Sequence, residues 1–520
     1  MLEIKDLSIW MRDTGRPLIE HLHFVLGPTD RAVIIGEEGN GKSSLLKTIV
    51  DPSLVEDYCE YSGKVLKNGM LVGYLEQDTP PEILEMTPAE FLDGPALLDG
   101  SLSRLAAQLQ LREELLFADQ RIATLSGGEK VKLRMIRLLA GEPDVLLLDE
   151  PTNDIDLATL EWLEGVISGS RVPVLYVSHD ETLIERTANV VIHLEQLKKK
   201  REARHTVERT GYRQYIAQRL SGLEKQEQVA RKQREEFNSQ MERWQQIYNK
   251  VEHQQAAITR QNPSGGRLLK KKVKALKSQE KRIQKNAENF LEIPEPEEAI
   301  ALSFSREIRI PQGKRVLEFH LDQLCAGGDT GRLLAENIHL TVNGPEHIGI
   351  IGDNGAGKTT LLRHICRQLQ GRSDLRIVYM PQDYRELLPY DQTPVDFLAR
   401  GQTRQEITQA RTYLGSMKYT HEEMTGKIGA LSGGQKAKLL FVWMILGEYN
   451  LLLLDEPTRN FSPLSNPVIR QMLSDFGGGI ISVTHDRKYL EEVCGRIYRL
   501  TPRGLEEVYP DAIGLSPHGE

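Results

Sequence analysis

This sequence has few cysteines, no long apolar run and no net positive charge, and each of these features excludes some classes of protein. Only four cysteines occur in 520 residues, none in CxxC spacing, which argues against a disulfide scaffold and favours core thiols in a reducing compartment. Apolar runs such as Val145–Leu148 and Leu451–Leu454 are far too short to span a bilayer. The chain opens on MLEIKDLSI, which alternates like a strand, so we expect no targeting peptide, a cytoplasmic location and no membrane part.

The sequence contains the same four motifs twice, in the same order. The pairs are GEEGNGKSS (36–44) and GDNGAGKTT (352–360), TLSGGEK (124–130) and ALSGGQK (430–436), VLLLDEPT (145–152) and LLLLDEPT (451–458), and VSHD (177–180) and VTHD (483–486). The spacing also repeats, because 24 residues separate Ser126 from Glu150 and Ser432 from Glu456. The repeat predicts two similar α/β domains, cassette 1 (1–208) and cassette 2 (300–520), joined by a linker (209–299).

The first motif of each set is typical of a loop that binds phosphate. A strand-like run, a glycine-rich turn and the start of a helix would let backbone N–H groups surround the phosphates of ATP. The lysine would add a positive charge, and the hydroxyl after it would bind Mg²⁺. The predicted loop residues are Gly36, Gly39, Asn40, Gly41, Lys42, Ser43 and Ser44 in cassette 1, and Gly352, Asn354, Gly355, Gly357, Lys358, Thr359 and Thr360 in cassette 2.

The later motifs indicate catalytic groups. An apolar run precedes each Asp-Glu pair and reads as a buried strand that carries two carboxylates to the phosphates. Asp149 and Asp455 suit the metal's outer shell, and the following residues, Glu150 and Glu456, suit orienting or deprotonating the attacking water. A lone histidine is more often structural, but His179 and His485 follow these glutamates at a fixed spacing, which favours contact with the γ-phosphate.

One such loop could match by chance, but four ordered motifs found twice resemble the ATP-binding cassette superfamily over about four-fifths of the chain. The resemblance implies that two cassettes pair head to tail within one chain and enclose two ATP molecules. Ser432, Gly433 and Gly434 would then complete the site of Lys42, and Ser126, Gly127 and Gly128 would complete the site of Lys358. Gln77 and Gln382 match the glutamines of this superfamily that contact Mg²⁺ and water. Trp10 is a candidate for the aromatic residue that stacks on adenine, and a tryptophan anchored at the surface is the alternative.

The two copies differ after the catalytic glutamate. The first reads PTNDID and places Asp156 where the superfamily keeps an aspartate, whereas the second reads PTRNFSPLSNP and has Ser462 there. Because this loop lies at the seam between cassettes in the superfamily, we expect the two ATP sites to be unequal. The sequence leaves open which of them is slower.

The linker reads as a hairpin of two helices. Residues 212–258 contain no proline and only one glycine, and their apolar residues follow coiled-coil spacing, which resumes after Asn-Pro-Ser-Gly-Gly. A fold-back between Pro263 and Ser264 would make this an antiparallel α-helical coiled coil. It would pair Ile258 with Leu269, Val251 with Leu276, Trp244 with Ile283, and Phe237 with Phe290.

The linker is strongly basic although the chain carries a net charge of −8. Residues 241–285 hold twelve Lys or Arg against three acids, and the predicted tip lies near 260–277. A row of lysines is often only a solvated helix face, but on a projecting hairpin it favours binding to a phosphate backbone without base reading. The predicted RNA-binding residues are Arg260, Arg267, Lys270, Lys271, Lys272, Lys274 and Lys277.

Two cassettes joined by a basic helical hairpin resemble the ABC-F family of ATPases. The resemblance implies a monomer that binds the bacterial ribosome and inserts its linker, with Asn262–Leu269 at the apex, from the tRNA exit site toward the peptidyl-transferase centre. Its contacts would be large-subunit rRNA and P-site tRNA. PTRNFSPLSNP further resembles the Vga/Lsa-type resistance group, which implies protection from lincosamides, pleuromutilins and streptogramins A. A housekeeping translation factor remains an alternative, a DNA-repair ATPase usually has zinc CxxC pairs or longer coils, and a transporter subunit would need membrane partners.

Overall fold

The computed structural model describes residues 1–92, 101–109, 111–197, 200–256, 263–287, 290, 303–327 and 331–510. It divides into two compact units, of which one combines Met1–Tyr212 with Glu297–Glu520 and the other is Arg213–Pro296. The first unit contains both cassettes and the second contains the linker. Each unit is described below by itself.

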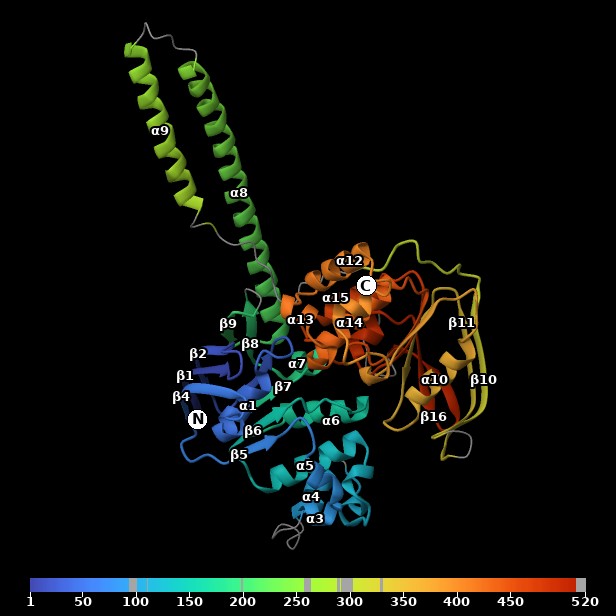
Figure 1. The fold of residues 1–520 in the computed structure, drawn as a ribbon. Helices are drawn as coiled ribbons and strands as arrows, with labels where there is room; N and C mark the ends of the chain where they lie inside the picture. The colour runs from blue at the N-terminus through green and yellow to red at the C-terminus, as the bar shows by residue number, and fades with distance from the viewer. Residues whose placement is uncertain are drawn as a thin grey trace. The chain divides into compact units, whose positions relative to one another are not determined.

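Cassette 1 is built on a six-stranded sheet in which five neighbouring strands are parallel and the last is antiparallel (Figure 1). The strands in spatial order are β5 (Val72–Leu75), β6 (Val145–Asp149), β7 (Val174–Val177), β3 (Arg31–Ile35), β8 (Val190–Leu197) and β9 (Glu202–Glu208). A second, antiparallel sheet is formed by β2 (Pro17–Leu26), β1 (Leu2–Met11) and β4 (Cys59–Leu66). The continuous apolar runs are those of strands buried on both faces, as the side chains of Val145–Leu148 show.

The helices of cassette 1 connect these strands. They are α1 (Lys42–Val50), α2 (Pro81–Glu85), α3 (Pro88–Leu92), α4 (Ser101–Gln108), α5 (Gly127–Ala140), α6 (Leu157–Ser168) and α7 (Glu181–Thr187). Ser126 caps the start of helix α5 with a capping box, since the serine hydroxyl accepts from the Glu129 N–H and the Glu129 carboxylate accepts from the Ser126 N–H. The SGG motif therefore fixes the start of a fourteen-residue helix.

Cassette 2 repeats the same sheet topology. Its strands in spatial order are β13 (Ile377–Met380), β14 (Leu451–Asp455), β15 (Gly479–Val483), β12 (His347–Ile351), β16 (Arg496–Thr501) and β17 (Gly504–Val508), with β10 (Arg315–Cys325) and β11 (Leu333–Asn343) in a separate antiparallel pair. Its helices are α10 (Lys358–Leu369), α11 (Pro394–Leu398), α12 (Arg404–Ser416), α13 (His421–Thr425), α14 (Gly433–Leu446), α15 (Asn466–Ser474) and α16 (Arg487–Glu492). The predicted fold of two P-loop α/β domains is confirmed.

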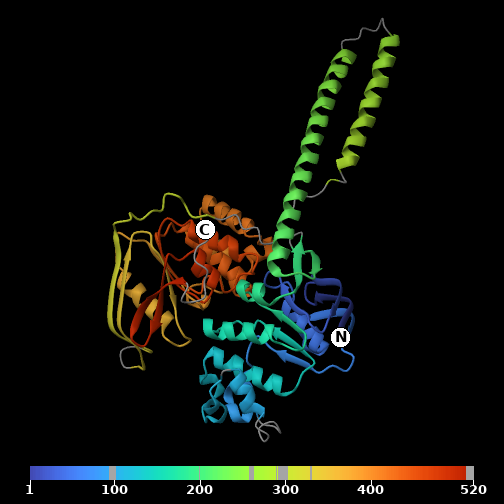
Figure 2. The same cartoon turned by 180° about the vertical axis from the view of Figure 1, so that it is seen from behind.

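The linker contains two long helices, α8 (Tyr212–Ala256) and α9 (Pro263–Ala287), which lie side by side in both views (Figures 1 and 2). Trp244, Val251, Leu276 and Ile283 form a buried cluster between them. The indole N–H of Trp244 donates to the carbonyl oxygen of Leu276 at 2.9 Å, and the rings of Phe237 and Phe290 meet with centroids 5.8 Å apart. Phe237 and Phe290 are thus in contact, as the predicted register requires.

The predicted position of the hairpin turn is wrong. Pro263 is the first residue of α9, and Ser264, Gly265 and Gly266 follow it inside the helix. Proline suits this place because the first turn of a helix leaves its N–H groups unpaired, so the missing donor costs nothing. The predicted Ile258, Arg260 and Asn262 lie outside the described residues.

Candidate nucleotide sites

Three loops meet at the same edge of each central sheet. In cassette 1, β3, β7 and β6 are neighbours, and their carboxyl ends lead into the P-loop, His179 and the Asp149-Glu150 pair. Strands β12, β15 and β14 do the same in cassette 2. Open α/β sheets bind ligands outside the carboxyl ends of their strands. The predicted phosphate-binding and catalytic residues are therefore brought together in both cassettes.

Each P-loop is closed by its own lysine. The ammonium group of Lys42 donates to the carbonyl oxygens of Gly36 at 2.9 Å and Glu37 at 3.1 Å, and Lys358 makes the same pair of contacts at 2.7 and 3.0 Å. Gly36 has φ of +147°, and a Cβ there would lie 2.3 Å from the carbonyl oxygen of Leu194, so only glycine fits. The remaining predicted loop residues occupy the same two turns and the helix starts that follow: Gly39, Asn40, Gly41, Ser43 and Ser44, and Gly352, Asn354, Gly355, Gly357, Thr359 and Thr360.

The oxygen atoms beside the lysines fit a magnesium ion. The Ser43 hydroxyl donates to Asp149 Oδ1 at 3.0 Å, and Thr359 hydrogen-bonds Asp455 in the same way. The other carboxylate oxygen of Asp455 is buried and has no hydrogen-bond partner among the described residues. Hydroxyl and carboxylate oxygens are the ligands that Mg²⁺ prefers. Burial raises the pKa of Asp149 to about 6, and a bound cation would hold this carboxyl in its ionised form.

The two predicted catalytic glutamates share an unusual backbone. Glu150 has φ of +46° and Glu456 has φ of +53°, a left-handed conformation that is uncommon outside glycine and often marks functional sites. Each also stands beside its predicted histidine. His179 Nε2 lies 3.0 Å from Glu150 Oε1, whereas His485 Nε2 lies 3.8 Å from Glu456 Oε1.

The pKa values of the two glutamates are shifted in opposite directions. Burial alone would raise the pKa of Glu150, but His179 and Lys42 outweigh it and lower the pKa to about 2. Burial and the neighbouring Asp455 raise the pKa of Glu456 to about 7. Burial and the charge of Lys358 lower the pKa of His485 to about 3, so this ring adds no positive charge beside Glu456.

The two cassettes complete each other's sites. A cavity of about 490 Å³ is lined by Lys358, Gln382, Glu456 and His485 from cassette 2 and by Gly127 from cassette 1. At the other P-loop, Gly433 and Gly434 lie against Glu38. This is the crossed arrangement that the resemblance implied, although the roles of the individual residues stay predictions.

Glu37 and Glu38, which our sequence analysis missed, fill the space between the first P-loop and cassette 2. Glu38 accepts from the backbone N–H groups of Gly433, at 3.0 Å, and Gly434 at the start of α14. Glu37 accepts from Lys438 at 2.9 Å and also binds two hydroxyls. The signal was present in the sequence, since GEEGNGKSS has glutamate where GDNGAGKTT has Asn354.

The loops after the glutamates are also unequal. Asp156 accepts from the Thr159 N–H at 2.9 Å and caps α6. Ser462, at the matching place in cassette 2, is buried and donates to Glu37 at 2.5 Å, and Ser465 joins the same carboxylate. The second loop is therefore engaged with the first P-loop. Whether the two sites also differ in rate stays a prediction.

Of three other predicted residues, Gln77, Gln382 and Trp10, only Gln382 lines the described cavity. Gln77 follows β5 and is exposed, and Gln382 follows β13 and lines the 490 Å³ cavity. Trp10 is half-buried at the end of β1, where it pairs with Pro17. The nearby Arg16 donates to the carbonyl oxygen of Gly39 at 2.9 Å, which ties this strand end to the P-loop. Base stacking by Trp10 stays a prediction.

A family model described as "ABC transporter" matches residues 19–153 and 335–459, which together make up half of the chain. The chain belongs to the ABC transporter family. It carries two ABC ATPase domains in tandem, one in each cassette. No helix in the described part of the chain is long and apolar enough to cross a membrane.

The ABC relatives of this chain include members of the F family. This chain is 26% identical over 425 residues to "ABC transporter F family member 5" of Arabidopsis thaliana. The aligned region makes up 80% of this chain but only 56% of that protein. The chain is 27% identical over 517 residues to "Ribosome protection protein VmlR" of Bacillus subtilis, covering 98% of this chain and 87% of that one. The solved "RNase-L Inhibitor" shares the fold with a TM-score of 0.59 at 16% identity, over 98% of this chain and 93% of that chain.

Proposed function

We propose that this chain is an ATP-driven ribosome-binding protein that protects the large ribosomal subunit from lincosamide, pleuromutilin and streptogramin A antibiotics, as the Vga/Lsa-type group does. Two ATP molecules would hold the cassettes together in a form that fits the tRNA exit site. The linker would then reach toward the peptidyl-transferase centre and displace the drug or shift P-site tRNA. This action would take place in the cytoplasm, where translating ribosomes are found.

The observation that carries the proposal is the exposed basic row on α9. The apolar side of this helix packs on α8 through Val273, Leu276 and Ile283. Its other side exposes a row of positive charges made by Arg267, Lys270, Lys271, Lys272, Lys274 and Lys277. A phosphate backbone neutralised by such a row releases its counterions, which favours binding without any reading of bases. The row suits rRNA or tRNA as a partner.

The site geometry supports an ATP cycle. The P-loop N–H groups and lysines would hold the phosphates, and the N–H groups at the start of α5 and α14 would contact the nucleotide held by the opposite cassette. Mg²⁺ held by Ser43 and Asp149, or by Thr359 and Asp455, would neutralise charge on the phosphates. Glu150 and Glu456 would orient the attacking water, and hydrolysis would separate the cassettes and release the ribosome.

The relatives bear on the choice between resistance and housekeeping roles. The similarity to a protein named for ribosome protection runs over 98% of this chain and is compatible with resistance, while relatives named only as ATP-binding proteins match over 96% and 97% of it. A housekeeping factor of the same family would instead alter peptide-bond formation when no drug is present.

Cell-free bacterial translation tests the proposal. Lincomycin, tiamulin or virginiamycin M is added to separate reactions with purified protein and ATP, and peptide synthesis is measured. We expect restored synthesis with the native protein and none with the E150Q/E456Q variant. Glutamine keeps the shape of each glutamate side chain but cannot act as the base. Restored synthesis in both, or in neither, would contradict ATP-dependent protection. Altered synthesis in the drug-free reactions would assign the chain to translation factors instead.

A further inference from the structure

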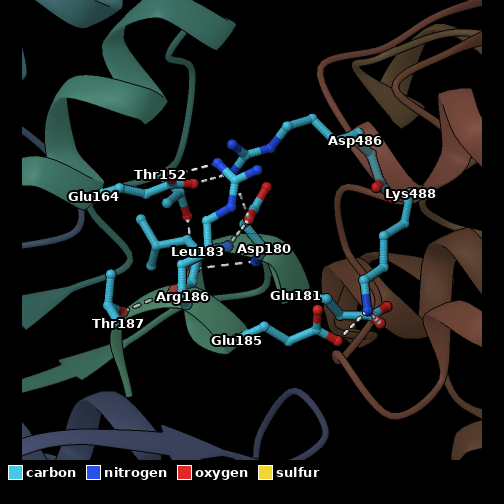
Figure 3. Close-up of polar contacts among 12 residues, drawn as sticks. Thr152, Glu164, Asp180, Glu181, Leu183, Glu185, Arg186, Thr187, Asp486 and Lys488 are labelled. Carbon is cyan, nitrogen blue, oxygen red and sulfur yellow. Dashed lines mark hydrogen bonds and ion pairs between the residues drawn. The ribbon is translucent and has the colours of Figure 1, made fainter. Parts of the chain in front are cut away.

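The seam between the cassettes contains two buried ion pairs that cross from one cassette to the other. Glu181 at the start of α7 binds Arg470 of α15 with an O–N distance of 2.6 Å. Glu164 of α6 binds Arg487 at the start of α16. All four residues are buried, with Arg470 only 2% exposed. Figure 3 shows Lys488 of cassette 2 beside Glu181 and Glu185 of cassette 1 at this seam.

These two pairs are equivalent to each other under exchange of the cassettes. Glu164 precedes Arg470 by 306 positions, and Glu181 precedes Arg487 by the same number. Ser126 and Ser432 are separated by this number too, so the residues occupy matching places in the two domains. At both places cassette 1 has an acid and cassette 2 has a base.

The surrounding residues follow the same rule. Within cassette 1, Arg186 binds Glu164 at 2.8 Å, and at the matching place in cassette 2 Glu492 binds Arg470 at 2.7 Å. Lys488 of cassette 2 adds a contact to Glu181 at 3.1 Å, where cassette 1 has the uncharged Thr182. Asp180 also accepts from Arg487, at 3.3 Å. The charge reversal therefore extends beyond the two central pairs.

We propose that these swapped charges are a pairing code, by which the acidic face of cassette 1 accepts the basic face of a cassette 2 and rejects another cassette 1. In a pair of two first cassettes, Glu164 would face Glu181 twice. In a pair of two second cassettes, Arg470 would face Arg487 twice. Buried like charges that face each other strongly disfavour an interface. The code directs each chain to close on its own unlike cassettes, whatever the partner of the linker.

The test exchanges residues between matching positions. The acidic-face variant, R470E/R487E/K488T/E492R, gives cassette 2 the residues of cassette 1. The basic-face variant, E164R/E181R/T182K/R186E, does the reverse. The exchange variant combines all eight substitutions and so restores opposite charges with their sides reversed. All are made in the full chain, and thermal melting, ATP hydrolysis and mass by light scattering are measured.

We expect both one-sided variants to melt at a lower temperature than the native protein. Their rates of ATP hydrolysis should be at least about tenfold lower, since close residues couple strongly. The exchange variant should recover most of both. A mixture of the two one-sided variants should form a 1:1 complex, because each then offers a complementary face to the other. One-sided variants that match the native protein would overturn the code. If they fail to fold, the exchange variant decides alone, because it carries every one of their substitutions and its failure would also overturn the code.

Discussion

The two nucleotide sites of this chain are built from the same motifs but are held in different ways. The second site opens on a cavity of about 490 Å³ that contains Lys358, Glu456 and His485. At the first site, Glu37 and Glu38 reach across to cassette 2 and bind the groups that face the P-loop. Glu38 in particular places a carboxylate on the N–H groups of Gly433 and Gly434, where an anion is favoured by the helix end.

The difference shows how a repeated fold can give unequal sites through a few side chains. Both P-loops have the same glycines and lysine, and both catalytic glutamates have the same left-handed backbone. The inequality comes from Glu38, which stands where the second P-loop has Asn354, and from Ser462 in the second cassette, neither of which alters the sheet. Because the carboxylate of Glu38 lies on N–H groups that would otherwise contact a phosphate, we expect the first site to bind ATP more weakly than the second.

The largest expected effect comes from removing the catalytic glutamates one at a time. We expect E456Q to lower ATP hydrolysis by at least about 100-fold, within the range for loss of a general base, because the second site would carry most of the turnover. E150Q should cost much less. Steady-state hydrolysis at saturating ATP measures both, and the E150Q/E456Q variant provides the baseline. Equal losses in the two single variants would show that the sites act alike.

A smaller effect is expected from exchanging the P-loop side chains. E38N gives the first loop the amide of Asn354. We expect about tenfold tighter ATP binding there, because the substitution removes the carboxylate that accepts from the Gly433 and Gly434 N–H groups. The converse substitution, N354E, should weaken the second site by a similar factor. Binding of a fluorescent ATP analogue measures each site alone, in a K358A background for E38N and a K42A background for N354E. Weaker binding by E38N would refute competition by Glu38.

The smallest effect is a dependence of stability on pH through Glu37. Burial opposes its ionisation, but Lys438, Ser462 and Ser465 outweigh burial and lower the pKa from 4.5 to about 2. Because the folded pKa lies below the unfolded one, the stabilisation is complete above pH 4.5 and is lost as pH falls toward 2.

The E37Q variant lacks this titration. The difference in unfolding free energy between the native protein and E37Q should therefore be constant from pH 7 to 6 and smaller by roughly 1 kcal/mol at pH 4. Urea unfolding at each pH measures it. A difference that stays constant down to pH 4 would show that Glu37 is not held in its ionised form by cassette 2.

Much of the fold followed from the repeated motifs, because glycine-rich loops and buried apolar strands are local patterns. The repeated motifs place the buried strands β6 and β14 inside their sheets, as the structure does. They also place Glu150 near His179, and these side chains are in contact. The hairpin turn could not be placed, because Pro263 is as well suited to begin a helix as to form a turn. The roles of Glu38 and Arg470 could not be read either, since each depends on a partner hundreds of residues away.

The most direct test of the proposed function is sedimentation of the E150Q/E456Q variant with bacterial ribosomes in the presence of ATP. The proposed function predicts that this variant remains bound to ribosomes with ATP and is released without it. Replacing Lys270, Lys271, Lys272, Lys274 and Lys277 by glutamine in the same background should weaken binding and flatten its dependence on salt. A variant that still binds ATP but does not sediment with ribosomes would contradict the proposed function.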